Sequence, residues 1–174
     1  MMQATTADLY DAHPQTVRVC DLQFRSFGKR MRFFGQCATL RTYENHLPIL
    51  RALKANGAGR VLVIDGGGSL RVGLVGDRIA GIAVENNWAG IVIFGAIRDS
   101  TAVNQLDIGI KALGATARRG WKDTMDAQDG PVEFGSVQFL PGSWVYADED
   151  SVIVSPVELE LEVQPVGEIL TVQK

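Results

Sequence analysis

Residues 76–99 read GDRIAGIAVENNWAGIVIFGAIRD and decide the fold, because they place a buried helix directly before a buried strand. Residues 79–85 are small or aliphatic up to the final glutamate, which is typical of a helix packed on a core. Asn87 and Gly90 are break signals, and the apolar run at 91–94 is typical of a strand buried on both faces. This order of elements predicts an α/β fold.

Three charged residues stand at the ends of these two elements. Asp77 lies at the start of the helix, and Arg98 and Asp99 directly follow the strand. If a parallel strand precedes the helix, the right-handed crossover rule brings the helix start and the strand end to the same carboxyl edge of the sheet. Open α/β sheets tend to bind ligands at that edge. We therefore expect Asp77, Arg98 and Asp99 to meet in one site.

Further apolar runs extend the predicted sheet. The run Val61 to Ile64 predicts a central strand, because all four residues are apolar and most are β-branched. Residues 70–75 alternate and fit another strand, whereas residues 108–113 fit either a helix or a strand, and residues 101–106 predict a short helix. Residues 33–42 predict a pair of strands around Gly35.

Two more helices are predicted upstream from capping signals. The pattern Thr5-Thr6-Ala7-Asp8 predicts a helix that ends at His13-Pro14. Pro48 opens a second helix, over residues 49–55, and Asn56-Gly57 closes it.

The C-terminal third predicts a loop followed by short strands. Residues 120–130 are polar and loop-like, with an exposed Trp121. Residues 157–163 alternate strictly, which predicts a half-buried strand on a core edge or on a neighbouring subunit. Four short β segments are predicted between them, at residues 131–134, 137–140, 144–147 and 151–154.

Length and composition predict one globular domain over residues 1–174. The chain is 46% hydrophobic and 21% charged, and its net charge of −3 argues against a dedicated nucleic-acid binder. No signal peptide and no apolar run long enough to span a bilayer are evident, so we expect a cytoplasmic protein that does not bind membranes. Cys20 and Cys37 do not form a metal motif and are expected to be buried thiols.

Several common chemistries are disfavoured by the motifs. The glycine run at 66–68 fails the dinucleotide fingerprint, whose sixth position is Arg71 here, and no Gly-Lys-Ser/Thr triplet completes a phosphate-binding loop. We interpret these glycines as tight turns, with a ligand pocket as the alternative. The two histidines, His13 and His46, are expected to lie far from the charged cluster and are not spaced as a ligand pair, which argues against a histidine metal site or a Ser-His-Asp triad. The nearest lysines are also distant, which argues against a Schiff base.

Carboxylates and an arginine therefore remain as the candidate chemistry. Taken alone, Arg98-Asp99 is better explained as a surface ion pair or a helix cap than as part of a site. In the predicted position, the N–H groups at 77–79 can hold a carboxylate, and Arg98 can bind a carboxylate or an oxyanion through two donors. Asp99, with Asp77 acting through water, suits Mg²⁺ or Mn²⁺. Together these groups would select a small anionic 2-oxo acid.

The chain resembles the family that contains the regulator of ribonuclease activity A and the divalent-metal 4-hydroxy-4-methyl-2-oxoglutarate aldolases. The resemblance covers roughly residues 5 to 155, and residues 156–174 form a C-terminal extension. The motifs that carry it are Val61-Leu62-Val63-Ile64-Asp65-Gly66-Gly67-Gly68-Ser69, Leu74-Val75-Gly76-Asp77, Gly95-Ala96-Ile97-Arg98-Asp99, Leu106-Asp107-Ile108-Gly109 and Val145-Tyr146-Ala147-Asp148. An earlier assignment of this family as a menaquinone methyltransferase finds no support in these residues.

The resemblance implies a fold and an assembly. The fold is a compact layered α/β sandwich of the swivelling β/β/α kind. The assembly is a homotrimer, or a dimer of trimers, with active sites between subunits. A carboxylate from the neighbouring subunit would complete each site, and the open candidates are Asp148, Glu149, Asp150 and the glutamates of the C-terminal extension.

The resemblance also implies roles for the site residues. Aldolases of the family carry an aspartate, twenty residues and then Arg-Asp, which Asp77, Arg98 and Asp99 match. Asp99 would bind Mg²⁺ or Mn²⁺ and Arg98 the substrate. The backbone of Gly76, Asp77, Arg78 and Ile79 would hold the pyruvate carboxylate, while Asp77 positions a water on the metal as acid or base.

Two functions follow from the resemblance. The first is a metal-dependent lyase that releases pyruvate from 4-hydroxy-4-methyl-2-oxoglutarate and also decarboxylates oxaloacetate. The second is a non-catalytic protein that binds ribonuclease E and inhibits RNA processing. The second aspartate, Asp99, favours catalysis.

Overall fold

The computed structural model describes residues 4–120 and 130–160, which form a mixed α/β fold. In chain order, the helices are α1 (Thr6–Ala12), α2 (Leu47–Leu53), α3 (Asp77–Glu85) and α4 (Ser100–Val103). The strands are β1 (Arg18–Val19), β2 (Arg25–Phe27), β3 (Phe33–Arg41), β4 (Val61–Asp65), β5 (Gly73–Val75), β6 (Gly90–Ile97), β7 (Gly109–Ala115), β8 (Val132–Phe134), β9 (Val137–Phe139), β10 (Trp144–Ala147) and β11 (Val152–Ser155).

One large sheet organises these elements. Its strand order is β1-β11-β10-β3-β4-β6-β7-β2, and β5 pairs with the end of β6. The middle strands β3, β4, β6 and β7 run parallel, whereas the outer strands pair antiparallel. The prediction that residues 61–64 form a central strand is confirmed, because β4 is hydrogen-bonded to β3 on one side and to β6 on the other.

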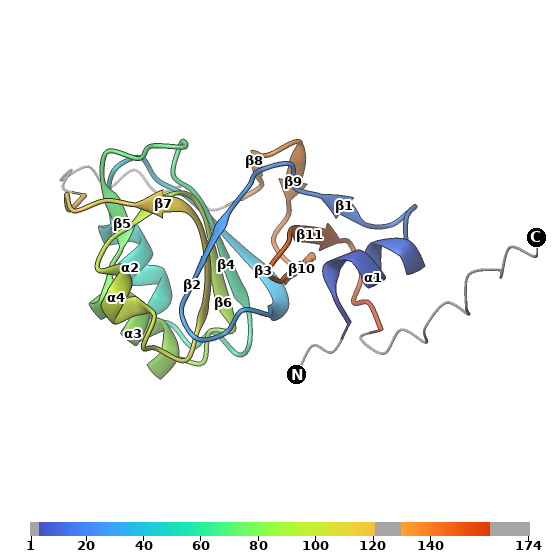
Figure 1. The fold of residues 1–174 in the computed structure, drawn as a ribbon, viewed down its shortest axis with the longest axis horizontal. Coiled ribbons are helices and arrows are strands. Elements are labelled where there is room, and N and C mark those ends of the chain that lie inside the picture. The colour runs from blue at the N-terminus through green and yellow to red at the C-terminus, as the bar shows by residue number, and fades with distance from the viewer. Residues whose placement is uncertain (1–3, 121–129, 161–174) are drawn as a thin grey trace, which may run out of the picture.

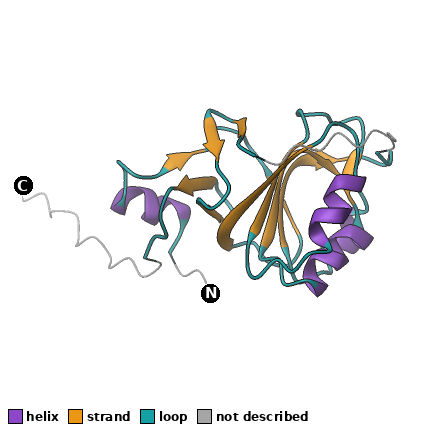
Figure 2. Cartoon of the chain, turned by 180° about the vertical axis from the view of Figure 1, so that it is seen from behind, coloured by secondary structure: helices purple, strands orange, loops and turns teal. Residues whose placement is uncertain are grey.

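The all-apolar strands are explained by a core on each face of the sheet. Helices α2, α3 and α4 cover one face (Figures 1 and 2), where Leu62 and Ile64 join their cluster of buried side chains. Val61 and Val63 point the other way, into a second cluster that includes residues of the β8–β9 hairpin. Because neighbouring residues in a strand point to opposite faces, burial on both faces requires an unbroken apolar run.

The N-terminal helix lies apart from the other three, against the outer strands β10 and β11. Its predicted capping box is present: Thr5 Oγ1 accepts from the Asp8 N–H, and the Asp8 carboxylate accepts from the Thr5 N–H at 2.9 Å. Leu9 then packs with Tyr146 and Ile153 in a third apolar cluster. His13 caps the C-terminus, as predicted.

The predicted break at Gly35 is wrong, because β3 runs without interruption from Phe33 to Arg41. Gly35 is required for close packing: a Cβ atom there would lie 3.3 Å from the Arg60 backbone and closer still to the Gly59 carbonyl oxygen. The other sheet predictions need smaller changes. Only residues 73–75 of the 70–75 run form a strand, and residues 109–113 of the ambiguous 108–113 run belong to β7.

The predicted strand over residues 157–163 is not present over residues 157–160, and the remainder lies outside the described residues. Residue 159 nevertheless contacts the core: the Leu159 side chain is buried, and its N–H donates to the Tyr146 hydroxyl at 2.7 Å. The predicted exposed Trp121 and most of its loop also lie outside the described residues. Cys20 and Cys37 are buried free thiols, as predicted.

Asp148 ties the start of α1 to the turn after β10. Its carboxylate accepts from the Thr6 N–H at 2.6 Å, from the Thr6 hydroxyl at 2.8 Å, and from the N–H groups of Asp150 and Ser151. Burial alone would raise the pKa of Asp148, but these hydrogen bonds outweigh it and hold the pKa below its ordinary value of 3.8.

We expect Asp148→Asn to lower the free energy of unfolding by about 1–3 kcal/mol, because the amide keeps only one acceptor oxygen and the buried Thr6 N–H loses the acceptor that Oδ2 provides. Since the folded-state pKa is depressed, the carboxylate stabilises the fold above pH 3.8, and this stabilisation is lost as the pH falls through the folded-state pKa. The difference in unfolding free energy between the wild type and the variant should therefore become smaller in acid. Urea denaturation of both proteins at several pH values measures this difference, with Asp150→Asn as the neighbouring control. A difference that does not change with pH would contradict this account.

Candidate functional site

The carboxyl edge of the sheet brings the three predicted charged residues together. β5 is parallel to β6, and α3 connects them, so the condition set by the crossover rule is met. Asp77 begins α3, while Arg98 and Asp99 follow β6, and all three line one open pocket. The predicted convergence of these residues is confirmed.

Gly76 allows the two chain segments to approach closely. A Cβ atom at position 76 would lie 2.8 Å from Asp99 Oδ2 and 3.1 Å from Arg98 Cγ. Gly73 is equally constrained, since a Cβ atom there would lie 2.9 Å from the Arg98 backbone nitrogen. The two glycines therefore let β5 and the start of α3 pack directly against the Arg98-Asp99 pair.

The N-terminus of α3 faces this pocket. Gly76 is the N-cap and offers no side chain, and the first hydrogen bond from a helix N–H to the backbone runs from Ala80 to the Gly76 carbonyl. The N–H groups of 77–79 precede that bond, and the Arg78 N–H donates to Asp77 Oδ1 at 2.7 Å. A carboxylate is thus already seated at this helix start, which is the kind of group that a helix N-terminus favours.

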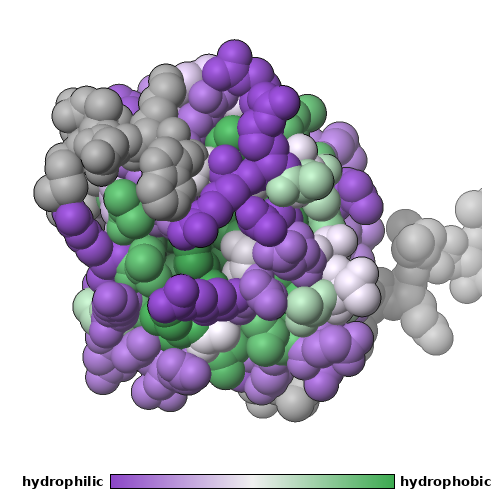
Figure 3. Space-filling model, turned by 90° about the vertical axis from the view of Figure 1, so that its left-hand side faces the viewer, coloured by the Kyte–Doolittle hydropathy of each residue, from purple (hydrophilic) through white to green (hydrophobic). Residues whose placement is uncertain are grey.

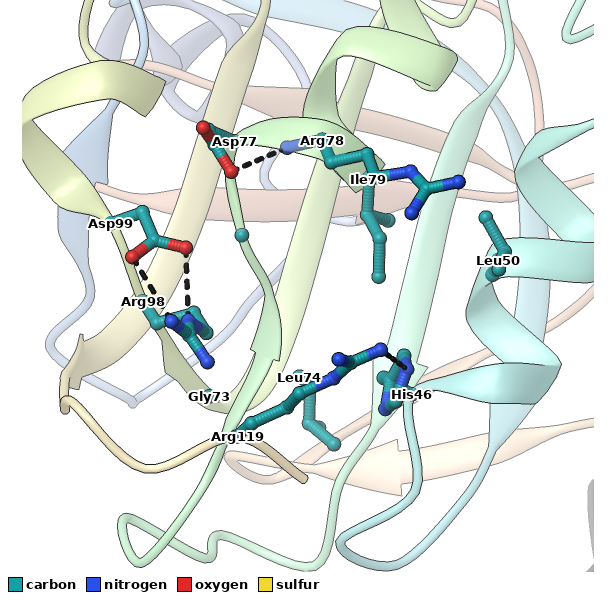
Figure 4. Close-up of a pocket in the computed structure, with 11 residues that line it drawn as sticks. His46, Leu50, Gly73, Leu74, Asp77, Arg78, Ile79, Arg98, Asp99 and Arg119 are labelled. Carbon is teal, nitrogen blue, oxygen red and sulfur yellow. Dashed lines mark hydrogen bonds and ion pairs between the residues drawn. The ribbon is translucent and has the colours of Figure 1, made fainter. Parts of the chain in front are cut away.

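Arg98 and Asp99 form an ion pair at the pocket wall (Figure 4). Arg98 Nε donates to Asp99 Oδ2 at 2.9 Å, and Nη2 lies 3.4 Å from Oδ1. Both side chains are about one-third exposed, at 31% and 37%. Ion pairs this accessible contribute little to stability, so the pair is better explained by what it offers a ligand.

Asp99 has an unusual backbone conformation. Its φ of 55° and ψ of 38° lie in the left-handed region, which few residues other than glycine adopt. Asp99 occupies the N-cap position of α4, yet its side chain makes no capping hydrogen bond. The carboxylate instead faces Arg98 and Gly76. Residues held in such conformations concentrate at functional sites.

His46 lies in the same pocket, so the expectation that both histidines are remote from the charged cluster is wrong for His46. It is the residue before α2 and is 4% exposed. Burial, together with Arg119 and Arg98, lowers the pKa of His46 against the opposing effect of its hydrogen bond to Gly120. Because 31 residues separate His46 from Asp77 in the sequence, no local pattern indicated that the two residues share a pocket.

Arg119 is a second pocket residue that no sequence motif indicated. Its Nη2 lies 3.2 Å from His46 Nε2. Its backbone pairs with Gly73 through an isolated parallel bridge. Figure 4 shows its side chain running from the Gly73 side of the pocket to His46.

Apolar side chains complete the pocket lining. Leu50 from α2, Leu74 from β5 and Ile79 from α3 share it with the charged groups. On the side of the molecule that carries α2, α3 and β5, apolar surface is visible in a hollow between hydrophilic side chains (Figure 3). The mixture suits a small ligand with a charged end and a hydrocarbon part.

The glycine run at 66–68 turns the chain after β4, as interpreted from the sequence. Gly67 and Gly68 have φ angles of 66° and 69°, and a Cβ atom at Gly66 would lie 2.7 Å from the Phe94 carbonyl oxygen. None of the three lines the pocket of Asp77 and Arg98.

The described residues fit a hard cation held by few protein ligands. They contain no group of three or more His, Cys, Asp or Glu side chains that could enclose a metal. The partly exposed Asp99 carboxylate fits Mg²⁺, which usually keeps several waters and takes one or two carboxylates. Of the carboxylates considered for a neighbouring subunit, Asp148 is buried and accepts four hydrogen bonds within the chain, and Glu149 pairs with Arg32.

Comparisons with known proteins agree on one family. The model of the RraA-like family, described as Aldolase/RraA, matches residues 6–154. A protein from Aromatoleum aromaticum with the provisional name 4-hydroxy-4-methyl-2-oxoglutarate aldolase is 44% identical over 154 residues, covering 88% of this chain and 97% of the relative. A Burkholderia mallei protein with the same provisional name is 46% identical over 160 residues, covering 89% and 96%.

Two solved structures have the same fold. One, titled the RNA-processing inhibitor RraA from Thermus thermophilus, superposes with a TM-score of 0.86 at 39% identity and covers 91% of this chain and 96% of its own. The other, from Geobacillus kaustophilus, also has a TM-score of 0.86, at 40% identity, and covers 89% and 96%. It is titled an S-adenosylmethionine:2-dimethylmenaquinone methyltransferase. No helix among the described residues is both long and apolar enough to cross a membrane.

Proposed function

Because the chain belongs to the RraA-like family, we propose that it is a divalent-metal-dependent aldolase that cleaves 4-hydroxy-4-methyl-2-oxoglutarate to pyruvate. The observation that carries this proposal is the meeting of Asp77, Arg98 and Asp99 in one pocket, with the Asp99 carboxylate directed into the site instead of capping α4. The provisional names of the relatives agree with it.

The substrate's 2-oxo acid end is bound by groups of three kinds. Its carboxylate accepts from the N–H groups at the start of α3, where orphan donors and the helix dipole favour an anion. Arg98 donates to the C2 oxygen through N–H groups not used on Asp99. Asp99, with Asp77 through water, would hold Mg²⁺ or Mn²⁺, and the cation would supply Lewis-acid polarisation of the carbonyl.

Cleavage then needs two proton transfers, which we assign to Asp77 through a water. The proton of the C4 hydroxyl leaves as the C3–C4 bond breaks, which makes C4 the carbonyl carbon of the first pyruvate. The electron pair of that bond passes to C3, C2 and the C2 oxygen as an enolate, which Arg98 stabilises. Protonation at C3 gives the second pyruvate. Oxaloacetate reaches the same enolate by losing CO₂, so its decarboxylation should be a side reaction.

Pyruvate release tests the proposal. With Mg²⁺ or Mn²⁺, we expect pyruvate from 4-hydroxy-4-methyl-2-oxoglutarate and, more slowly, from oxaloacetate, followed by coupled reduction with lactate dehydrogenase. A chelator should stop the release, and added Mg²⁺ should restore it. Release no faster than that of an Asp99→Asn variant from either substrate would refute the aldolase.

We also propose that the chain assembles as a homotrimer, alone or paired as a dimer of trimers. In this assembly a neighbouring subunit supplies another carboxylate to each site. Light scattering on the purified protein measures this assembly.

A second function is favoured by the structure from Thermus, which is titled an RNA-processing inhibitor. In that case the chain would bind ribonuclease E, and its acidic surface would face a basic segment of the enzyme. Binding to ribonuclease E that survives Arg98→Ala would support this function. A lack of binding at physiological salt would exclude it.

A further inference from the structure

A groove at the amino edge of the sheet, where β3, β6 and β7 begin, has no part in the proposed function. Its lining combines basic and apolar side chains with one carboxylate: Lys29, Arg30, Arg32, Met31, Phe34 and Asp107. We propose that residues 161–163 of the C-terminal extension, which lie outside the described residues, dock in this groove of their own chain. The inference is independent of the proposed function, because the pocket of Asp99 is at the carboxyl edge.

The described part of the extension is held close to this groove. Ser155 Oγ donates to the Val157 carbonyl at 2.7 Å and accepts from the Val157 N–H at 3.2 Å, which fixes the chain as it leaves β11. Leu159 is then buried, and its N–H donates to the Tyr146 hydroxyl. The Tyr146 ring stacks on Phe34, with centroids 5.9 Å apart and 6° between the ring planes. Because Phe34 lines the groove, Leu159 is one aromatic ring away from it.

The spacing of apolar residues in the extension matches the spacing of these rings. Apolar residues alternate with glutamates from position 157 to position 163. In an extended chain alternate side chains point to the same side, and residues two apart are separated by about 6.6 Å. This separation is close to the 5.9 Å between the two ring centroids. Leu159 lies in one apolar cluster with Tyr146. In an extended continuation, Leu161 would therefore lie on the neighbouring ring, Phe34.

Charge decides between two directions for this continuation. Tyr146 also stacks on Trp144, at 6.5 Å, so spacing alone would allow the extension to run along β10 instead. The residues opposite Trp144 on the two adjacent strands are Gln36 and Ser155, and both are neutral. The groove beyond Phe34 is basic, so it is the better match for a segment that carries glutamates.

The basic residues of the groove can reach the glutamates of a docked segment. The lining has three basic residues against one carboxylate, and Glu149, which pairs with Arg32, offsets only one of these positive charges. With the apolar side chains facing the groove floor, Glu160 and Glu162 would point outwards to its rim. Lys29 is exposed there, and its long, flexible side chain can follow a carboxylate.

Disulfide trapping in the full chain tests this docking. Val163 would follow Leu161 and reach Met31, which is 41% exposed. The groove pair is therefore Met31→Cys with Val163→Cys. The control, called the strand pair, is Gln36→Cys with Val163→Cys, because Gln36 is exposed and lies beside Trp144 in the alternative direction. With glutathione disulfide as the oxidant, we expect the groove pair to close within one chain roughly 10-fold faster than the strand pair, since docking raises the effective concentration of one thiol near the other.

The native cysteines should not compete in this experiment. Burial raises the pKa of the Cys20 thiol and raises the pKa of Cys37 to about 12, so both provide little thiolate near neutral pH. Peptide mapping identifies the bonded cysteines, and melting temperatures check that each variant is folded.

A charge exchange tests the contact with Lys29. Lys29→Glu in the groove pair should slow its closure by about 3- to 10-fold, because a favourable surface charge pair becomes a repulsive one. Adding Glu162→Lys should restore the rate. Lys54→Glu, at an exposed lysine that does not line the groove, is the matched control and should not change it.

Three results would overturn the inference. The first is closure of the strand pair as fast as, or faster than, closure of the groove pair. The second is a disulfide-linked dimer in place of a closed monomer on a non-reducing gel, which would assign the extension to another copy of the chain. The third is equal slowing by Lys29→Glu and Lys54→Glu, which would exclude recognition by charge. Each of these results leaves the test of pyruvate release unaffected.

Discussion

Asp99→Asn should lower metal-dependent pyruvate formation by more than about 100-fold while the protein remains folded. Outer-shell partners of metal sites alone cost 10- to 100-fold when they are removed, so loss of the carboxylate that would hold the cation should cost more. Asparagine has the same shape and tolerates the left-handed backbone that Asp99 adopts, so the fold should be preserved.

The matched control is Asp107→Asn. Asp107 is an exposed carboxylate that accepts two bonds of 2.8 Å from Arg30, away from the pocket. Steady-state rates at saturating Mg²⁺, together with Mg²⁺ titration of each variant, give the comparison. If Asp99→Asn keeps more than a tenth of the wild-type rate, Asp99 is not the protein's metal ligand.

Arg98→Lys should lower kcat by roughly 100- to 1000-fold, which is typical for loss of one donor to a developing oxyanion. Lysine keeps the positive charge but not the planar fork that lets Arg98 bind Asp99 and the C2 oxygen together. KM should change much less than kcat, because the enolate forms only along the reaction path. Arg30→Lys, in the ion pair with Asp107, is the control.

The split between kcat and KM decides the role of Arg98. If the substitution raises KM and leaves kcat unchanged, Arg98 binds substrate and transition state equally and does not stabilise the enolate. Measurement with both 4-hydroxy-4-methyl-2-oxoglutarate and oxaloacetate extends the test, because both should pass through the same enolate and lose activity in parallel.

The sequence was sufficient where a feature depends on neighbours along the chain. The capping box of α1, the buried run of β4 and the helix-to-strand order of α3 and β6 are local patterns, and all are confirmed. The convergence of Asp77 with Arg98 could also be predicted, because crossover handedness converts chain order into position.

Features that depend on distant chain segments could not be predicted. Glycine is typical of a turn, but at position 35 it is required for another reason. The backbone of Gly59, 24 positions later, packs so closely against it that a Cβ atom would not fit. His46 and Arg119 are 73 residues apart, and neither belongs to a motif with a fixed spacing. Charge type alone could not distinguish Arg119, in the pocket, from Arg118, which does not line it. Long-range packing decides such contacts, and one sequence carries little information about it.

The left-handed backbone at Asp99 has a consequence for the engineering of this protein. Glycine adopts that conformation without steric cost, so a screen for thermal stability alone should favour glycine at position 99. The selected protein would have a more relaxed backbone and no carboxylate between Arg98 and Gly76. Stability and chemistry are therefore opposed at this one position, and a stabilised version of the chain should be designed with Asp99 held fixed.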